Sequence, residues 1–378
     1  MRRAVITGYG VVSACGRGKH LLANALIEGR SGIAPVTLFD TNGCRCRQAA
    51  EVASIGPDIL NRAGQFLSLA VDEALADAGL TVDLPHITVF QGTAHGPLDL
   101  WEHNADICGA LPARLGENTW KKLGGQVSVT TLTSACVAST WATGLALHAI
   151  RCGKTDLALV VGAEVLTNFL FRGFDALRLL SSSSCRPFDR QRDGLILGEG
   201  AAVLVLESET AARKRGAQIR AELAGFGAAS DASHLTAPDV SGKGAAAALS
   251  YALKDAGSID GIDYINMHGT GTLHNDRMEI NALKRVFGGD ANIIPISSTK
   301  SMTGHTSGAA GAIELAVCLA ALEQECIPPT IGLDEPDPAC KGFDTVAGEA
   351  RRQRCNTVVN INSGFGGNNA ALVLRRYA

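Results

Sequence analysis

One cysteine stands where a reactive thiol would be expected. Cys136 lies in the stretch TLTSACVASTWATGLALHAIRCG, residues 131–153, between a predicted strand and a helix of small and apolar residues. A thiol at a helix N-terminus feels the positive end of the helix dipole, which favours the thiolate and lowers its pKa. The pattern therefore predicts a nucleophile, although a buried cysteine more often serves as a small hydrophobic residue.

A histidine ends the apolar run INM and precedes a loop rich in glycine and threonine. His268 is followed by Gly-Thr-Gly-Thr, which places the hydroxyls of Thr270 and Thr272 and several backbone N–H groups within reach of a bound ligand. A single histidine at a strand end is more often structural than catalytic. The segment alone is therefore a weak indication of a site.

Two further segments carry a lysine, a second histidine and a glycine-dense turn. Lys300 and His305 flank a glycine-containing turn in STKSMTGH, and Glu314 lies on the small-residue helix that follows, so we expect an ion pair with Lys300. The stretch NINSGFGGNN, residues 360–369, follows an apolar strand. Its glycines let backbone N–H groups approach a reacting carbonyl closely.

The elements that must position these residues occur twice along the chain. VITGYGVVSA at 5–14 and ELAGFGAASD at 222–231 each predict a strand running into a Gly-aromatic-Gly bend. Two Ala- and Leu-rich helices are predicted to end at Gly79 and Gly257. The helix after Cys136 has its counterpart in the small-residue helix after His305. These matches follow the same order in both copies, which indicates an internal repeat.

Two similar halves with alternating strands and helices predict an α/β protein. Strands such as LALVVGAE are nearly continuous apolar runs, as expected of strands that are covered on both faces. We place the boundary near residue 217, so that residues 1–217 carry the candidate nucleophile and residues 218–378 carry both histidines, the lysine and the glycine-rich turn. With no low-complexity linker between them, the halves should form one rigid unit.

Composition excludes several classes of function. The net charge of −3 gives no sign of the basic face of a nucleic-acid binder. The N-terminal apolar run is interrupted at Gly8 and Gly10, too early for a signal peptide or a membrane span. Eleven cysteines without regular spacing argue against a disulfide framework and favour the cytoplasm. Cys44 and Cys46 lack a second ligand pair, so we expect no metal site.

Taken together, the motifs resemble β-ketoacyl-acyl-carrier-protein synthases over nearly the whole chain. The motifs that carry the resemblance are TSACVAS, RPFDRQRDGLILGEGAAVLVLE, NMHGTGT, STKSMTGH with GAAGAIE, and SGFGG. The set is similar to the elongation branch, which uses Cys-His-His, and not to the Cys-His-Asn branches. The resemblance implies the thiolase fold, with two pseudo-symmetric halves in a layered αβαβα arrangement. Ser363 replaces a family phenylalanine, and SGFGG and HGTGTLHND are similar to type II polyketide and polyene ketosynthases.

The resemblance also implies roles for individual residues. Cys136 would carry an acyl group, and malonyl-acyl-carrier protein would lose carbon dioxide and attack it, with His268 and His305 donating hydrogen bonds to the enolate. Lys300 would organise the site, and the backbone N–H groups of Cys136 and Phe365 would form the oxyanion hole, with Phe365 also acting as gatekeeper. The remaining matched positions are two substrate-binding hydroxyls and three structural acids: Thr270, Thr272, Asp276, Glu279 and Glu314.

Partners and alternatives follow from the same resemblance. It implies an acyl carrier protein as partner, no cofactor, and a homodimer or a heterodimer with a ketosynthase-like chain-length factor, paired through the central strand of each half. The alternative is a non-elongating ketosynthase-like subunit, or an acyltransferase that acts with such a partner. Segments 102–133 and 177–189 are expected to be shorter than in the family. Acyl-chain length, pathway and the identity of the partner chain stay open.

Overall fold

The protein is built around one large mixed sheet, with helices on its faces. The computed structural model describes residues 1–56, 60–81, 86–257 and 261–377. In spatial order the strands of this sheet are β11 (Ile296–Ser297), β10 (Tyr264–Asn266), β14 (Thr357–Gly364), β15 (Asn368–Arg376), β9 (Ala221–Ser230), β1 (Ala4–Ser13), β8 (Gly200–Ser208), β7 (Leu157–Glu164), β5 (His86–Gly92) and β6 (Gln126–Leu132), with β2 (Gly16–Arg17) beside β1.

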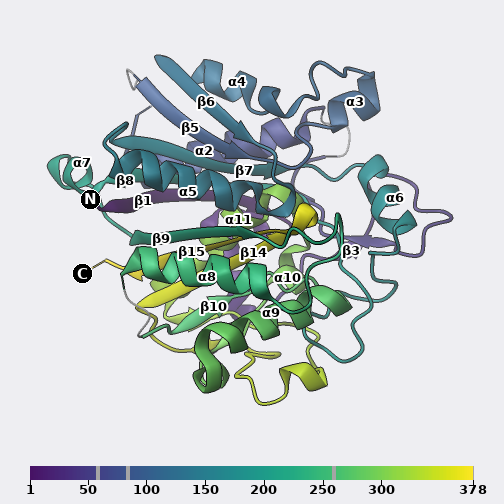
Figure 1. Ribbon diagram of the computed structural model, residues 1–378. Helices are drawn as coiled ribbons and strands as arrows, with labels where there is room; N and C mark the ends of the chain where they lie inside the picture. Colours follow the sequence, from purple (N-terminus) through teal and green to yellow (C-terminus); the bar gives the residue numbers. More distant parts are fainter. Residues whose placement is uncertain (57–59, 82–85, 258–260, 378) are drawn as a thin grey trace.

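The strand order repeats outward from the middle of the sheet. Strands β1 and β9 pair there over only three residues, from Ala4 opposite Leu223 to Ile6 opposite Ala221. Moving outward, β8 corresponds to β15, β7 to β14, β5 to β10 and β6 to β11. The two halves predicted from the internal repeat are therefore present. Figure 1 shows β1 and β9 side by side, with both termini at the same end of the molecule.

Helices form layers around the two halves of the sheet. Helices α5 (Ala138–Arg151) and α11 (Ala310–Gln324) contact strands of both halves and so make up the central layer. Helix α2 (Arg62–Asp77) packs on β1 and β8, and α8 (Lys243–Ala256) packs on β9 and β15 (Figure 1). Every residue of α11 from Ala310 to Leu322 is buried, as expected of a helix that is covered on all sides. This is the expected αβαβα layering.

The two Gly-aromatic-Gly segments are not bends, contrary to the sequence prediction. Strands β1 and β9 continue through them. A Cβ atom at Gly10 would lie 2.2 Å from the Ala70 carbonyl oxygen on α2, and one at Gly227 would lie 2.1 Å from that of Ala248 on α8. The glycines are therefore required because a helix backbone packs directly on each strand.

Helices α2 and α8 end as predicted. Gly79 and Gly257 adopt left-handed backbone conformations, with φ of 64° and 81°. The other elements of the described chain are shorter or lie outside the sheet: α1 (Lys19–Glu28), β3 (Ala34–Pro35), β4 (Gln48–Ala49), α3 (Asp99–Asn104), α4 (Glu117–Lys122), α6 (Asn168–Ala176), α7 (Glu209–Lys214), α9 (Leu273–Phe287), α10 (Lys300–Thr303), β12 (Cys326–Ile327) and β13 (Arg351–Arg352). Among the described residues, no helix is long and apolar enough to cross a membrane.

Candidate active site

The candidate nucleophile sits at a tight turn between a strand and a buried helix. After β6 the chain makes a short 3-10 turn at Ala135–Val137, and α5 begins at Ala138. Ala135 has a φ of 48°, a left-handed conformation that costs a non-glycine residue free energy. Ser307, just before α11 in the other half, shows the same feature with a φ of 45°. The two equivalent turns bring Cys136 and His305 to the same place.

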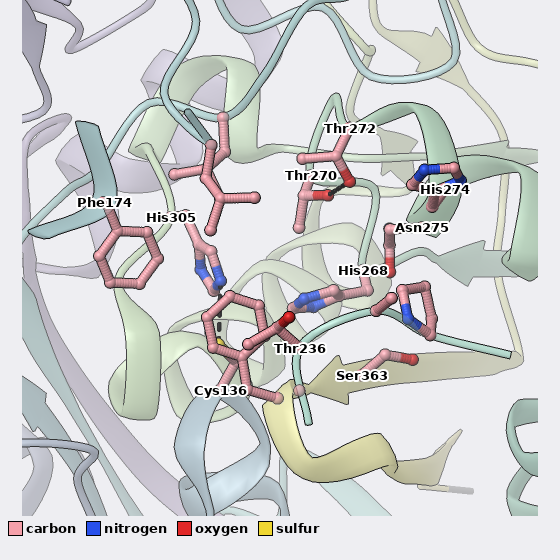
Figure 2. Close-up of a pocket in the computed structure, with 16 residues that line it drawn as sticks. Cys136, Phe174, Thr236, His268, Thr270, Thr272, His274, Asn275, His305 and Ser363 are labelled. Atoms are coloured by element: carbon pink, nitrogen blue, oxygen red, sulfur yellow. Dashed lines mark hydrogen bonds between the residues drawn. The ribbon is translucent and has the colours of Figure 1, made fainter. Parts of the chain in front are cut away.

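A cavity of roughly 280 Å³ collects the predicted side chains. Cys136, His268 and His305 line it together (Figure 2). Its other lining residues form an apolar set and a more polar set: Phe174, Leu179, Leu195, Ala237, Pro238, Gly364 and Phe365, and then Thr236, Thr270, Thr272, His274, Asn275 and Ser363. The structure thus brings Cys136 together with two histidines that follow it by more than a hundred residues in the sequence.

The two histidines differ in their distance from the thiol, because only His305 contacts the sulfur directly. Nε2 of His305 lies 3.1 Å from Sγ of Cys136, within hydrogen-bond distance (Figure 2). The ring of His268 stands edge-on to that of His305, with centroids 5.2 Å apart and planes at 85°. His305 is therefore the ring in direct contact with the sulfur, and His268 is its neighbour across the cavity.

Burial determines the protonation states in the site. It raises the pKa of the Cys136 thiol to about 12, although the Lys300 charge and a hydrogen bond from the Phe365 backbone N–H both lower it. The expectation of a lowered pKa is therefore wrong for the resting thiol, because loss of water outweighs the favourable charges. Burial, followed by the Lys300 charge, holds the pKa of His268 and that of His305 well below the ordinary value. Thiol and rings are neutral at neutral pH.

Lys300 is the buried cation that adds to the effect of burial on the two rings. Its Nζ donates a hydrogen bond of 2.6 Å to the carbonyl oxygen of His268 and forms the expected ion pair with Glu314. Both side chains are almost fully buried, at 1% and 3% exposure. Burial raises the pKa of Glu314, and the Lys300 charge opposes that rise.

Two further predicted acids hold the loop that carries His268. Glu279 accepts hydrogen bonds of 2.7 Å from the backbone N–H groups of both His268 and Gly269. Burial raises the pKa of this carboxyl to about 8. Asp276 accepts a 3.2 Å hydrogen bond from the Gly271 N–H and pairs with Arg192 at 3.4 Å. Neither carboxyl lines the cavity. Both therefore act by fixing the backbone of the loop that carries His268.

The glycine-rich turn lies against the nucleophile. The half-buried ring of Phe365 stacks on Phe174 of α6, with centroids 6.0 Å apart and planes at 12°. Ser363 donates a 2.7 Å hydrogen bond to Asn369 and so lines the cavity with a small polar group. Across the cavity, the Oγ1 atoms of Thr270 and Thr272 are 2.9 Å apart (Figure 2).

Sequence reasoning missed two kinds of buried polar residue. Glu164, at the end of β7, accepts hydrogen bonds from the backbone N–H groups of Ala94 at 2.7 Å and Gly308 at 3.0 Å. Because these two residues belong to different halves, Glu164 links the halves beside the site. Asn266, Asn360 and Asn362 form a connected amide network. Alternate asparagines in an otherwise apolar strand were the available signal. Within the described ranges, no group of three or more ligating side chains is arranged to hold a metal ion.

Comparisons with known proteins agree with this geometry. Residues 1–212 match the family described as "Beta-ketoacyl synthase, N-terminal domain", and residues 220–334 match its "C-terminal domain". The chain is 36% identical to "Nodulation protein E" of Rhizobium sp. (strain N33), covering 99% of each chain. It is 37% identical to "Tetracenomycin polyketide synthase ketoacyl synthase alpha subunit" of Streptomyces glaucescens, covering 99% of this chain and 97% of that one.

The comparisons also bear on chain length and fold. The two alignments span 402 and 415 positions, more than the 378 residues here, so these relatives contain segments that this chain lacks. A solved structure, "The ishigamide ketosynthase/chain length factor", superimposes with a TM-score of 0.92 at 38% identity, with full coverage of both chains. The chain therefore belongs to the β-ketoacyl synthase family and is a condensing acyltransferase, a β-ketoacyl-acyl-carrier-protein synthase of fatty-acid or type II polyketide biosynthesis.

Proposed function

We propose that Cys136 is the residue that carries the acyl group, and that the two histidines divide the remaining chemistry. The observation that supports this most strongly is the 3.1 Å contact between Cys136 Sγ and His305 Nε2 inside a cavity that His268 also lines. A nucleophile and a proton acceptor within hydrogen-bond reach are the geometric requirement for covalent catalysis.

The first half-reaction transfers the acyl group. Sγ of Cys136 attacks the carbonyl carbon of the carrier thioester, a new C–S bond forms, and the bond to the carrier thiol breaks. The proton of Cys136 passes through His305 to the departing thiolate. A route through His305 suits the neutral site, because neither a free thiolate nor an imidazolium has to persist. The backbone N–H groups of Cys136 and Phe365 stabilise the tetrahedral oxyanion.

The second half-reaction forms the carbon–carbon bond. The bond between the malonyl carboxylate and its methylene carbon breaks, carbon dioxide leaves, and the electron pair forms an enolate. Neutral His268 and His305 donate hydrogen bonds to the enolate oxygen. The methylene carbon attacks the Cys136 thioester, the Cys136 thiolate leaves and takes up one proton, and the β-ketoacyl product stays on the malonyl carrier.

The other predicted residues support these steps. Burial, helped by the Lys300 charge, keeps both rings neutral, while Glu314 compensates that charge. Glu279 and Asp276 fix the His268 loop, and the Thr270 and Thr272 hydroxyls bind the carrier arm. Phe365 closes the cavity over the nucleophile through its stacking on Phe174.

We propose an acyl carrier protein and a second ketosynthase-like chain as partners. A related structure is described as "AntDE:AntF (apo): type II PKS acyl-carrier protein in complex with its ketosynthase bound to the hexaketide" (31% identity, TM-score 0.92), and another as a ketosynthase "in Complex with its Chain Length Factor" (29%, 0.86). Pairing through the central strand of each half, as the resemblance implies, is disfavoured, because the inner strands of the sheet already have a neighbour on both sides. Strand β6, an edge of the sheet, offers free backbone groups.

The proposal also covers the pathway, the cellular compartment and the way the two halves act together. The HGTGTLHND and SGFGG motifs favour a type II polyketide or polyene pathway over ordinary fatty-acid elongation. All eleven cysteines are free, which suits a reducing cytoplasm. Residues 1–217 and 218–378 act as one unit, since the nucleophile comes from one half and both histidines from the other. The presence of Cys136 argues against a non-elongating subunit.

The test is the intact mass of the protein after incubation with a panel of acyl-carrier thioesters. The mass should rise by one acyl group in the unmodified protein and in Cys152→Ala, which removes an exposed thiol. It should stay unchanged in Cys136→Ala. Acylation of the Cys136→Ala protein at the wild-type rate would overturn the proposal. The acyl lengths that load fastest would define the substrate class.

A further inference from the structure

A chain of buried side-chain amides runs from β10 to the active site. The Tyr264 hydroxyl donates to Oδ1 of Asn266 at 3.0 Å, and Nδ2 of Asn266 donates to Oδ1 of Asn360 at 2.8 Å. Nδ2 of Asn360 then donates to Oδ1 of Asn362 at 2.8 Å, and Nδ2 of Asn362 donates to Oε2 of Glu314 at 2.6 Å. Every bond has the same direction, and the chain ends at a carboxylate that is paired with a lysine.

The direction of this chain fixes how the Asn362 amide is oriented. Its Oδ1 accepts from Asn360 and also from the Thr140 hydroxyl at 2.6 Å. With both of its oxygen contacts accounted for, the amide presents its nitrogen to Glu314, whose Oε1 is paired with Lys300 and whose Oε2 accepts from Nδ2 of Asn362. An amide nitrogen carries two hydrogens, and one of them remains after the bond to Glu314.

The remaining hydrogen of Asn362 has the His268 ring within hydrogen-bond distance. Nδ2 of Asn362 lies 3.4 Å from Nδ1 of the His268 ring. Because Asn362 can only donate there, Nδ1 must accept, and the ring proton must reside on Nε2. Nδ1 is thus engaged behind the site, which leaves Nε2 as the nitrogen of His268 available to the cavity that the ring lines.

We propose that Asn362 is a positioning residue that sets the tautomer of His268, so that the ring always presents an N–H donor to the reacting oxygen. The inference rests on the proposed function only for the identity of that oxygen, the malonyl-derived enolate. The tautomer itself follows from the hydrogen-bond network. Asn362 does not line the cavity, so it acts through His268 and not on the substrate.

His305 lacks such a constraint. Among the residues that the structure describes, its Nδ1 has no hydrogen-bond partner, while its Nε2 contacts Cys136. Either nitrogen of His305 can therefore carry the proton. This freedom suits a ring that first accepts the thiol proton and later donates to the enolate. The network thus gives two neighbouring histidines different tasks, a fixed donor and a switchable relay.

The direct test is nitrogen-15 NMR of histidine-labelled protein, with the His268 signals assigned by their loss in His268→Gln. In the unmodified protein, His268 should be protonated at Nε2 only, from pH 6 to pH 8. In Asn362→Ser, which removes the amide donor, the two tautomers should become mixed. The matched control is Asn266→Ser, which makes the same change in the network without touching His268, and it should leave the tautomer unchanged.

Activity supplies a second readout. Asn362→Ser should slow malonyl-carrier decarboxylation by about 10²-fold, the effect of losing an oxyanion donor, and leave acyl loading of Cys136 within about twofold. In Asn266→Ser the ratio of the two rates should match the unmodified protein. A proton on Nδ1 of His268 in the unmodified protein would overturn the inference even if Asn362→Ser does not fold. An unchanged tautomer in folded Asn362→Ser would overturn it too, whereas failed loading of Cys136 would count only against the proposed function.

Discussion

Nζ of Lys300 lies 2.6 Å from the carbonyl oxygen of His268, so the cation that adds to burial in lowering the pKa of this ring donates a hydrogen bond to the backbone of the same residue. The contact couples position and electrostatics. Any shift of the His268 loop moves the ring and its nearest positive charge together. Glu279 fixes the backbone of the same loop, because it accepts hydrogen bonds from the N–H groups of His268 and Gly269.

The Lys300–Glu314 pair should be needed for activity, whereas an uncharged pair in its place should keep most of the stability of the fold. Lys300→Met leaves Glu314 buried without a counter-charge, which should lower the free energy of unfolding by about 3–5 kcal/mol. Lys300→Met combined with Glu314→Gln should recover much of that loss while condensation stays impaired. Urea unfolding and a condensation assay on both variants provide the check. A single variant as stable as the unmodified protein would contradict the assigned ion pair.

Alkylation of Cys136 should report its protonation state. Because burial raises the pKa of this thiol to about 12, the rate of iodoacetamide labelling should increase about tenfold per pH unit between pH 7 and pH 9. Cys136 should still react before the fully buried Cys318, since only Cys136 lines the cavity. Peptide mass spectrometry over a pH series measures both rates. A plateau below pH 8 would show that the helix dipole outweighs burial after all.

Acid should destabilise the protein through its two site histidines. Their pKa values are depressed in the folded state, so below the ordinary value of 6.5 the unfolded chain binds more protons than the folded one. Stability is therefore complete above that pH and is lost as the pH falls below it. The two rings together should contribute up to about 2.7 kcal/mol per pH unit.

The comparison for this pH effect is the double variant His268→Gln with His305→Gln. Its free energy of unfolding in urea, measured from pH 7.5 to pH 5, should fall less steeply than that of the unmodified protein. Other titrating groups are common to both proteins and cancel in the difference. Parallel curves would mean that the rings are not held neutral by the fold.

Assembly should depend on the edge strand β6. Val129 lies in this strand with 38% of its surface exposed, so Val129→Lys should place a charge in a pairing surface and weaken the dimer. Tyr251→Lys, an equally drastic change on the outer helix α8, should not. Light scattering at micromolar concentration, alone and with a chain-length-factor partner, distinguishes them. Equal molar masses for both variants would argue against pairing through β6.

The fold and the meeting of the motifs were largely predictable from the sequence. The internal repeat predicted two halves, and the structure brings Cys136, His268 and His305 into one cavity. The pKa of Cys136 was mispredicted because it depends on burial, which the position of a residue at a helix N-terminus does not reveal.

The amide network and the close glycine contacts could not be predicted from the sequence, because both depend on how separate elements pack against each other. Asn266 and Asn360 become neighbours only through the parallel register of β10 and β14, which pairs them directly. Neither strand alone shows that its asparagine has a partner. Likewise, GYG and GFG predict a turn when read locally, and only the packing of α2 and α8 explains them as close helix–strand contacts.

The central claim is that Cys136 carries the acyl group while His268 serves the malonyl half-reaction. It is tested by measuring acyl loading of Cys136 by mass, and malonyl-carrier decarboxylation separately, in His268→Ala and His305→Ala. His268→Ala should load at nearly the normal rate and decarboxylate about 10²–10³-fold more slowly, whereas His305→Ala should be slow in both steps. If His268→Ala instead loads poorly and decarboxylates normally, the division of labour between the two rings is contradicted.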